Sequence, residues 1–245
     1  LIAGINAAME ILGREPLVLD RSEAYIGVLI DDLVTKENHE PYRMMTSRAE
    51  YRLLLRQDNA DLRLTKKGYE IGLISKERYD WVCKKEQMIK EEIDRVAKVH
   101  VGANKEVQAL LESYGSIPLN TGVTLTELIR RPELDYDKLA PIDHERPELP
   151  EEVREQVNIL IKYDGYISRQ IKQVESFKKL EKKKIPEGFD YDEVPSLRIE
   201  ARQKLKLYSP TSIGQASRIS GVSPADVSVL LVYMEQMNHH GEHHS

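Results

Sequence analysis

Apolar residues at helical spacing are the feature that most limits how this chain folds. From residue 75 to residue 99 the apolar side chains recur at three- and four-residue steps, which places them on one face of an amphipathic helix. The same spacing extends from residue 151 to residue 184, whereas only residues 16–19 favour a short strand. The sequence therefore predicts an all-α protein, with further helices expected at 1–12, 22–35, 47–57, 104–113, 124–130, 196–207, 212–220 and 224–237.

Missing motifs exclude several classes of chemistry. The chain of 245 residues contains no Gly-x-Gly turn for a dinucleotide and no Gly-Lys-Ser/Thr phosphate loop. Its one cysteine, Cys83, cannot form an internal disulfide, and we expect a buried structural thiol. No run of apolar residues is long enough for a transmembrane helix. The first residues lack both a basic leader and an initiator Met, so we expect a piece of a longer cytoplasmic protein.

Three arginines form the strongest candidate for anion binding. Arg48, Arg52 and Arg56 are four residues apart on the helix expected at 47–57, so they would line one face of it. Ser47 and Glu50 have the spacing of a capping box that would start this helix. A row of guanidinium groups suits a phosphate backbone. The alternative is structural, with the arginines in surface ion pairs to Glu50, Asp58 and Asp61.

Charge is unevenly distributed, although the whole chain carries a net charge of −5. Residues 141–160 contain six acids and two bases, whereas residues 161–185 contain eight bases and three acids. Much of this basic charge lies in the run from Lys178 to Lys184, at the end of the longest predicted helix. The run is a second candidate for nucleic-acid binding, and the alternative is a solvated helix end whose cations complement the helix dipole.

The proline-rich segment and the C-terminal residues carry further signals of organisation. Prolines between residues 132 and 150 predict a linker. Residues 211–231 have the helix, glycine turn and helix of a helix-turn-helix motif, but the second helix begins Pro224-Ala225-Asp226 without a basic residue. Such a helix is poorly suited to DNA, so we expect a corner used for packing or protein docking. The histidines of residues 239–245 are interpreted as a solvated tail rather than a metal site.

Two stretches of the chain closely resemble a known family. The first is residues 21–36 with 40–44 and 46–56, which includes Thr46-Ser47-Arg48-Ala49-Glu50-Tyr51-Arg52. The second is Ile213-Gly214-Gln215-Ala216-Ser217-Arg218 with residues 221–226. Both are similar to the MnmG (GidA) family, the flavin-dependent tRNA uridine 5-carboxymethylaminomethyl modification enzymes. The resemblance covers residues 1–238.

The resemblance implies that the catalytic machinery lies elsewhere in a longer parent protein. It implies that residues 1–20 end an FAD-binding domain, that 21–149 and 150–238 are two helical regions, and that 239–245 are a tail. The parent would use FAD and NADH to modify the wobble uridine (position 34) of tRNA, and neither cofactor is expected on this chain. Cys83 matches neither catalytic cysteine of the family, so no catalytic residue is predicted.

The resemblance also implies the partners: tRNA, the GTPase MnmE and a second copy in a homodimer, with no DNA and no membrane. The residues expected to contact tRNA are Arg43, Arg48, Arg52, Arg56, Lys179, Lys182 and Lys183. Those expected at the partner surface are Ile213, Gly214, Gln215, Ser217, Arg218, Gly221, Pro224 and Asp226. The alternative function is a module for dimerisation and GTPase docking without tRNA contact.

Overall fold

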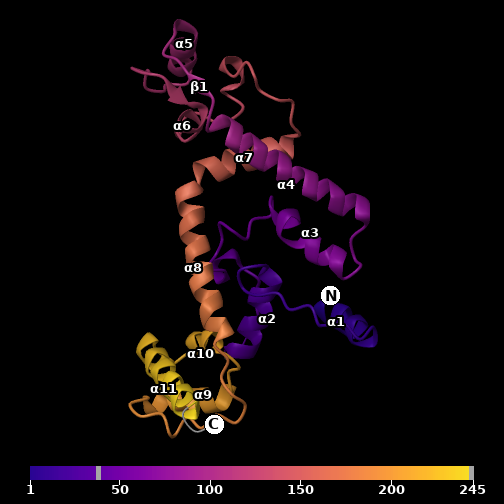
Figure 1. Cartoon of the computed structure of the whole chain (residues 1–245), viewed down its shortest axis with the longest axis vertical. Helices are drawn as coiled ribbons and strands as arrows, with labels where there is room; N and C mark the ends of the chain where they lie inside the picture. The colour runs from indigo at the N-terminus through magenta and orange to yellow at the C-terminus, as the bar shows by residue number, and fades with distance from the viewer. Residues whose placement is uncertain (37–39, 243–245) are drawn as a thin grey trace. The chain divides into compact units, whose positions relative to one another are not determined.

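The computed structural model describes residues 1–36 and 40–242, with side chains described as far as residue 237. It is predominantly helical, which confirms the predicted fold class (Figure 1). The chain forms two compact units, and each is made of two separate stretches of sequence. Unit 1 comprises Leu1–Pro16 and Leu55–Arg169, and unit 2 comprises Leu17–Leu54 and Gln170–Ser245.

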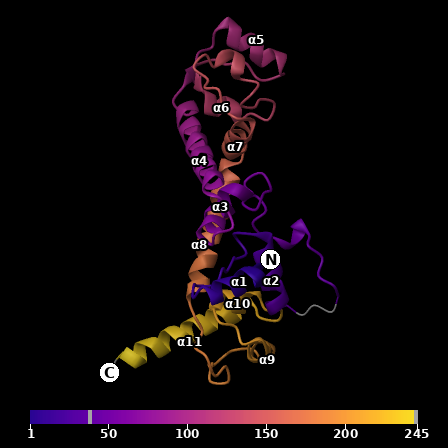
Figure 2. The same ribbon diagram turned by 90° about the vertical axis from the view of Figure 1, so that its right-hand side faces the viewer.

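Unit 1 is built on a long helix, α4 (Lys76–Val96), against which three other helices pack: α3 (Ala60–Glu70), α6 (Leu125–Ile129) and α7 (Glu151–Lys162). Figure 2 shows α4 and α7 side by side. The other elements of the unit are α1 (Ile2–Ile11), β1 (His100–Val101), α5 (Lys105–Ser113), β2 (Val123–Thr124) and the 3-10 helix η2 (Ala140–Ile142).

Local capping fixes where several helices of unit 1 begin. Ser75 accepts a hydrogen bond from the Arg78 amide at the start of α4, and Asn104 does the same for α5. Thr124 forms a complete capping box with Glu127 at the start of α6. These signals are local in sequence, and the predicted helices at 75–99, 104–113 and 124–130 are confirmed within a few residues.

The core of unit 1 includes part of the segment predicted to be a linker. Leu134 and Leu139 are 1 % and 2 % exposed, and Tyr136 and Ile142 are also buried. They join apolar side chains of α4, α6 and α7 in a single cluster. The linker prediction was therefore wrong, because prolines at 132, 141, 147 and 150 shape turns between residues that the core still buries.

Two further expectations need correction. Residues 16–19 form no strand in the described part of the chain, where the one sheet is the antiparallel pair β1 and β2. The helix expected at 151–184 is two helices, α7 and α8 (Asp164–Lys182), separated at Tyr163. The first residues of α8 belong to unit 1 and the remainder to unit 2.

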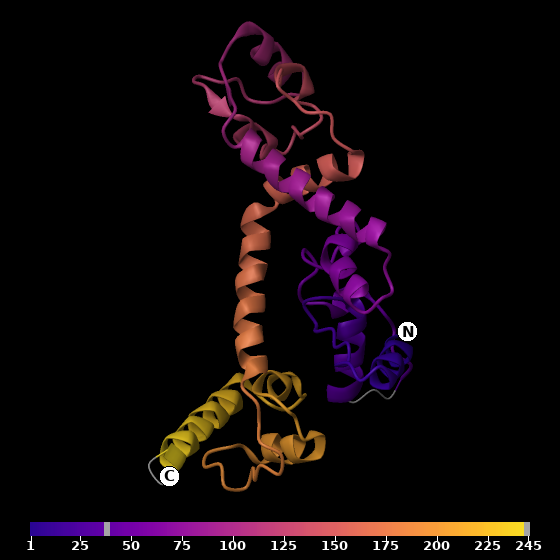
Figure 3. The same cartoon turned by 45° about the vertical axis from the view of Figure 1, so that its right-hand side comes forward.

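Unit 2 combines α2 (Tyr25–Thr35), a short 3-10 helix η1 (Thr46–Arg48) and the C-terminal helices α9 (Ile199–Tyr208), α10 (Ile213–Arg218) and α11 (Pro224–Glu242). Figure 3 shows the last three, in orange and yellow, gathered together. Their buried side chains form a second core cluster, which includes Leu205, Ile213, Ala216 and Leu230. This helical corner matches the helices expected at 196–207, 212–220 and 224–237.

Candidate nucleic-acid interface

The three-arginine row of the sequence prediction does not exist as a helical face. The chain is helical only over η1, and residues 49–57 form turns and extended backbone, so the helix expected at 47–57 was wrong. This helix does not form because the carboxylate of Glu50 is bound by another side chain. This carboxylate does not cap a helix but accepts two hydrogen bonds from Arg21, at 2.6 Å from Nη2 and 3.3 Å from Nε.

Arg21 is the centre of a charged network in unit 2. Its side chain is only 2 % exposed, and its Nη1 atom lies 2.6 Å from Asp32 and 3.0 Å from Asp31. Burial alone lowers the pKa of Arg21, but the hydrogen bonds to Glu50 and Asp32 outweigh it and raise the pKa above its ordinary value. The guanidinium therefore stays charged and ties the segment around Glu50 to α2.

Asp32 gathers donors from several directions. The Tyr42 hydroxyl donates to its carboxylate at 2.7 Å, and the Lys36 ammonium lies 2.8 Å away. Although burial acts to raise the pKa of Asp32, these donors lower it below its usual value. Burial and the bond to Asp32 raise the pKa of Tyr42 to about 12. The Tyr42 ring is thereby fixed in place, and the guanidinium of Arg48 lies 5.1 Å from its centre in a cation–π contact.

Arg218 forms the other half of the network. Its guanidinium donates to both carboxylate oxygens of Asp31, at 2.7 and 2.6 Å, and also pairs with Glu181. It lies 4.9 Å from the centre of the Phe177 ring. Only 14 % of the Arg218 side chain is exposed. Because Arg218 is on α10, Asp31 on α2 and Glu181 on α8, these ion pairs join the three helices within the unit.

Three arginines project from this framework into solvent: Arg43, Arg48 and Arg52 are all exposed. Among the described side chains of residues 1–36 and 40–237, no acidic group forms an ion pair with any of them. The nearby acids are already paired, because Asp31, Asp32 and Glu50 face Arg21, Arg218 or Lys36. The charges of the three exposed arginines are therefore available to an anionic ligand.

Arg56 is different, because it forms an ion pair with a nearby acid, as the alternative interpretation of the arginines predicts. Its Nε atom pairs with Asp58 at 3.0 Å, and its Nη2 donates to Gln156 of α7 at 3.1 Å. Gln156 in turn donates to Asp58 at 2.6 Å. Arg56 thus fastens the loop before α3 to the core of unit 1.

The basic run at the end of α8 is partly neutralised. Lys178 pairs with Asp20 at 3.3 Å, and Lys183 pairs with Glu235 at 2.6 Å. Lys179 and Lys182 are exposed. Their proposed contact with tRNA stays a prediction, and the exposed pair is the part of the run that fits it.

Of the eight residues expected at the partner surface, three are buried, three are partly buried and two are exposed. Ile213 is fully buried, and a Cβ added to Gly214 would lie 2.4 Å from the Glu181 carboxylate. The Gln215 side chain accepts the Thr211 amide at 2.7 Å, and Gly221 has a φ of +94° in the turn before α11. Ser217 and Pro224 are the exposed members of the set, so they are the ones a partner can reach.

Asp226 is a structural residue at the start of α11. Its carboxylate accepts the Ser223 amide at 2.8 Å and the Arg198 guanidinium at 2.6 Å, and the Asp226 amide donates back to the Ser223 hydroxyl. This reciprocal arrangement is a capping box with an aspartate. The donors, Arg198 above all, hold the pKa of Asp226 well below its usual range.

Substitution of Asp226 by asparagine is expected to destabilise unit 2 by about 2 kcal/mol at pH 7, because it removes the negative charge that faces Arg198 and one of the two acceptor oxygens. A depressed pKa stabilises the fold above the ordinary aspartate pKa, and this stabilisation is lost as the pH falls toward the folded-state pKa. The difference between wild type and Asp226→Asn in urea unfolding should therefore shrink below about pH 4. A difference independent of pH would contradict this assignment.

Sequence reasoning missed Arg21, because nothing in its spacing marks it as the partner of acids 10 to 29 residues away.

Cys83, expected to be buried, is exposed on α4. The described residues contain no group of three or more His, Cys, Asp or Glu placed to hold a metal ion. The expected histidine tail lies outside the residues whose side chains are described. No described helix has the length and apolar character needed to cross a bilayer.

Comparisons with known proteins agree with this architecture. The model of the "tRNA modifying enzyme MnmG/GidA C-terminal helical domain" matches residues 76–171, and that of the "C-terminal helical bundle" of the same enzymes matches residues 173–245. The MnmG tRNA uridine 5-carboxymethylaminomethyl modification enzyme of Lachnoclostridium phytofermentans is 69% identical over 97% of this chain, and that of Caldicellulosiruptor saccharolyticus is 62% identical over 96%.

A solved structure extends the likeness to three dimensions. GidA of Aquifex aeolicus superposes with a TM-score of 0.76 at 43% identity, over 94% of this chain and 36% of that one. The chain spans 38% of the length of the two curated relatives above. Fold and similarity define the class, which is a helical region matched by models of C-terminal helical domains. Within this class, the chain belongs to the MnmG/GidA family and corresponds to its C-terminal helical domains.

Proposed function

We propose that this chain contacts tRNA for a wobble-uridine modification enzyme, and that Arg43, Arg48 and Arg52 bind its phosphate backbone. The observation that carries the proposal is the exposure of these three cations on a framework whose own charges are already paired. Unpaired arginines of this kind position a nucleic acid through its phosphates without reading its sequence. Lys179 and Lys182 add cationic charge on α8 of the same unit.

Combined substitution of Arg43, Arg48 and Arg52 by alanine is expected to weaken binding of a tRNA transcript about 10- to 100-fold at low salt. The slope of log affinity against log salt should fall by about two to three, because each lost phosphate contact removes about 0.7–0.9. The measurement is a fluorescence titration at several salt concentrations. Arg78→Ala removes an exposed arginine of α4 in unit 1 and serves as the matched control. Wild-type affinity and slope in the triple variant would disprove the proposal.

The redox chemistry of the parent enzyme remains a proposal about residues outside this chain. The sequence has no glycine-rich dinucleotide turn, and the only sheet in the described residues is a pair of two-residue strands. These features do not fit a site for FAD or NADH. We therefore assign no catalytic step to this chain.

Docking of a GTPase, with or without dimerisation, is the second proposed function. It is supported by the exposed apolar side chains Val232 and Met237 on α11, which lie near the chain end in the same unit as Ser217 and Pro224. Replacing Val232 and Met237 by serine would alter this surface while leaving Arg218 paired with Asp31, and would therefore separate the two functions. Loss of partner binding with retained tRNA affinity would assign docking to the C-terminal helices.

A further inference from the structure

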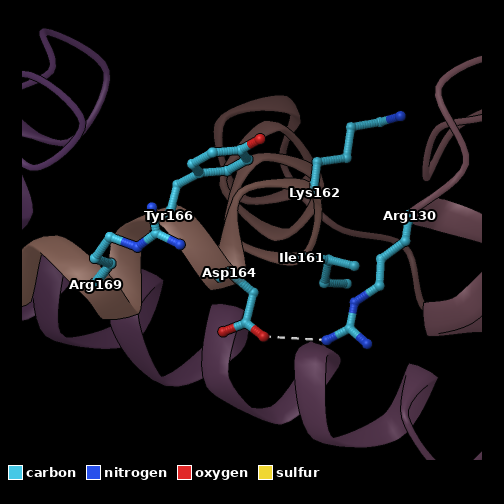
Figure 4. A pocket seen from close by; sticks show the side chains of 7 residues that line it. Arg130, Ile161, Lys162, Asp164, Tyr166 and Arg169 are labelled. Carbon is cyan, nitrogen blue, oxygen red and sulfur yellow. Dashed lines mark hydrogen bonds and ion pairs between the residues drawn. The ribbon is translucent and has the colours of Figure 1, made fainter.

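Unit 1 contains a cationic groove whose residues are not among the predicted tRNA contacts. It lies where α7 ends and α8 begins, and its volume is about 480 Å³. Figure 4 shows Arg130 on one side of Asp164, with Tyr166 and Arg169 on the other. The residues that define its character are Arg130, Lys162, Asp164, Gly165, Tyr166 and Arg169.

The groove has a surplus of positive charge. Its only acid, Asp164, pairs with Arg130 at 3.1 Å, and both side chains are more than half exposed. Such an exposed ion pair contributes little to stability, so a phosphate can replace the carboxylate at little cost. Arg169 is exposed and has no ion-pair partner in the part of the chain that the structure describes. Two guanidinium groups therefore flank the opening.

Lys162 is held rigidly at the wall of the groove. Its ammonium donates to the Arg131 carbonyl at 2.9 Å and to the Leu134 carbonyl at 2.5 Å. An ammonium group carries three N–H donors, so one remains for a ligand. Burial lowers the pKa of Lys162, as expected for a cation whose two protein partners are carbonyl groups and not carboxylates.

An aromatic surface stands beside the cations. Tyr166 is 61% exposed, so its ring is accessible to a ligand. The neighbouring Gly165 leaves open space, because a Cβ built there would meet no atom within 4 Å. Exposed aromatic rings next to arginines are the combination on which unpaired bases stack.

We infer that this groove binds an unpaired nucleotide of tRNA, with the phosphate held by Arg130 and Arg169 and the base stacked on Tyr166. The inference rests on the proposed function and deepens it, because it adds a base-stacking subsite to the phosphate contacts of unit 2. A paired base has no free face for Tyr166, so single-stranded loops or ends are the chemistry that fits.

The test uses the full chain and an eight-nucleotide single-stranded RNA that carries one 2-aminopurine. The double variant Arg130→Gln and Arg169→Gln should weaken binding about tenfold or more, and Tyr166→Leu should abolish the change in 2-aminopurine fluorescence while Tyr166→Phe retains it. Asp164→Asn removes the competing carboxylate and should strengthen binding severalfold. A purely structural groove would not give this opposite pair of effects.

The outcomes separate this inference from the proposed function. If the groove variants bind the oligonucleotide as wild type does, while substitution of Arg43, Arg48 and Arg52 still weakens tRNA binding, the groove assignment is wrong and the proposed function stands. If the unaltered chain binds neither tRNA nor the oligonucleotide, both are overturned. Equal binding of the single-stranded RNA and its duplex would also overturn the stacking subsite.

Discussion

Replacement of Arg21 by alanine is expected to destabilise unit 2 by about 3–5 kcal/mol, the largest effect of any substitution considered for this chain. The guanidinium is 2 % exposed and faces three carboxylates, at 2.6 Å from Asp32, 3.0 Å from Asp31 and 2.6 Å from Glu50. Without it, the fully buried carboxylate of Asp32 loses its closest cation. Arg21→Lys should recover only part of the loss, because an ammonium lacks the planar fork that reaches Asp32 and Glu50 together.

Hydrogen exchange followed by mass spectrometry can localise this effect. Amides of α2 and of residues 46–54 should lose protection in Arg21→Ala, whereas those of α4 in unit 1 should keep it. Arg52→Ala is the matched control, because it removes an exposed arginine of the same segment and should change stability by less than about 0.5 kcal/mol. Unchanged protection in α2 would show that the network around Arg21 is not what holds this segment.

Glu92→Ala is expected to destabilise unit 1 by about 3–4 kcal/mol. Glu92 is 3% exposed and accepts the Tyr136 hydroxyl at 2.7 Å and the Arg95 guanidinium at 2.6 and 2.9 Å. Its removal leaves a buried hydroxyl without an acceptor and leaves Arg95 with Asp143 alone. These contacts attach the proline-rich segment to α4, so the segment should loosen in the variant.

The single tryptophan, Trp81 on α4, reports on this unit in urea unfolding. Glu91→Ala is a close control, since Glu91 is the neighbouring residue but is exposed and accepts a hydrogen bond from Gln87 on the same helix. It should change the free energy of unfolding by less than about 0.5 kcal/mol. Equal effects of the two substitutions would mean that the buried contacts of Glu92 do not stabilise unit 1.

The helices that the sequence predicted well carry their own signals. α4 has an amphipathic stripe and a Ser75 cap, α5 has Asn104 before it and Gly115 in left-handed conformation after it, and α6 has its capping box. Periodicity and capping involve residues within a few positions of one another, so they can be recognised without knowledge of the fold. The resemblance in residues 21–56 and 213–226 was equally local, and the family it indicated is confirmed.

The candidate site was predicted in composition but not in geometry. Arg48 and Arg52 are exposed as a phosphate contact requires, yet not on a helix, and Arg56 is engaged by Asp58 and Gln156. The apparent capping box of Ser47 and Glu50 misled the prediction, because a buried guanidinium competes for the same carboxylate. The helix α3, at residues 60–70, was also missed, although it is amphipathic; it packs against α4, the next helix along the chain.

The helical class, the ends of the well-capped helices and the family can be recognised from the amino-acid sequence alone, because each depends on neighbouring residues or on short contiguous motifs. Which charges are paired and which remain available is known only from the folded structure. Arg21 forms an ion pair with Glu50, and Arg218 forms one with Asp31, which is 187 residues away in the sequence. Arg43 and Arg52, in contrast, remain exposed. The free energy of a charged side chain depends on the dielectric and partners around it, and folding brings these from distant parts of the chain.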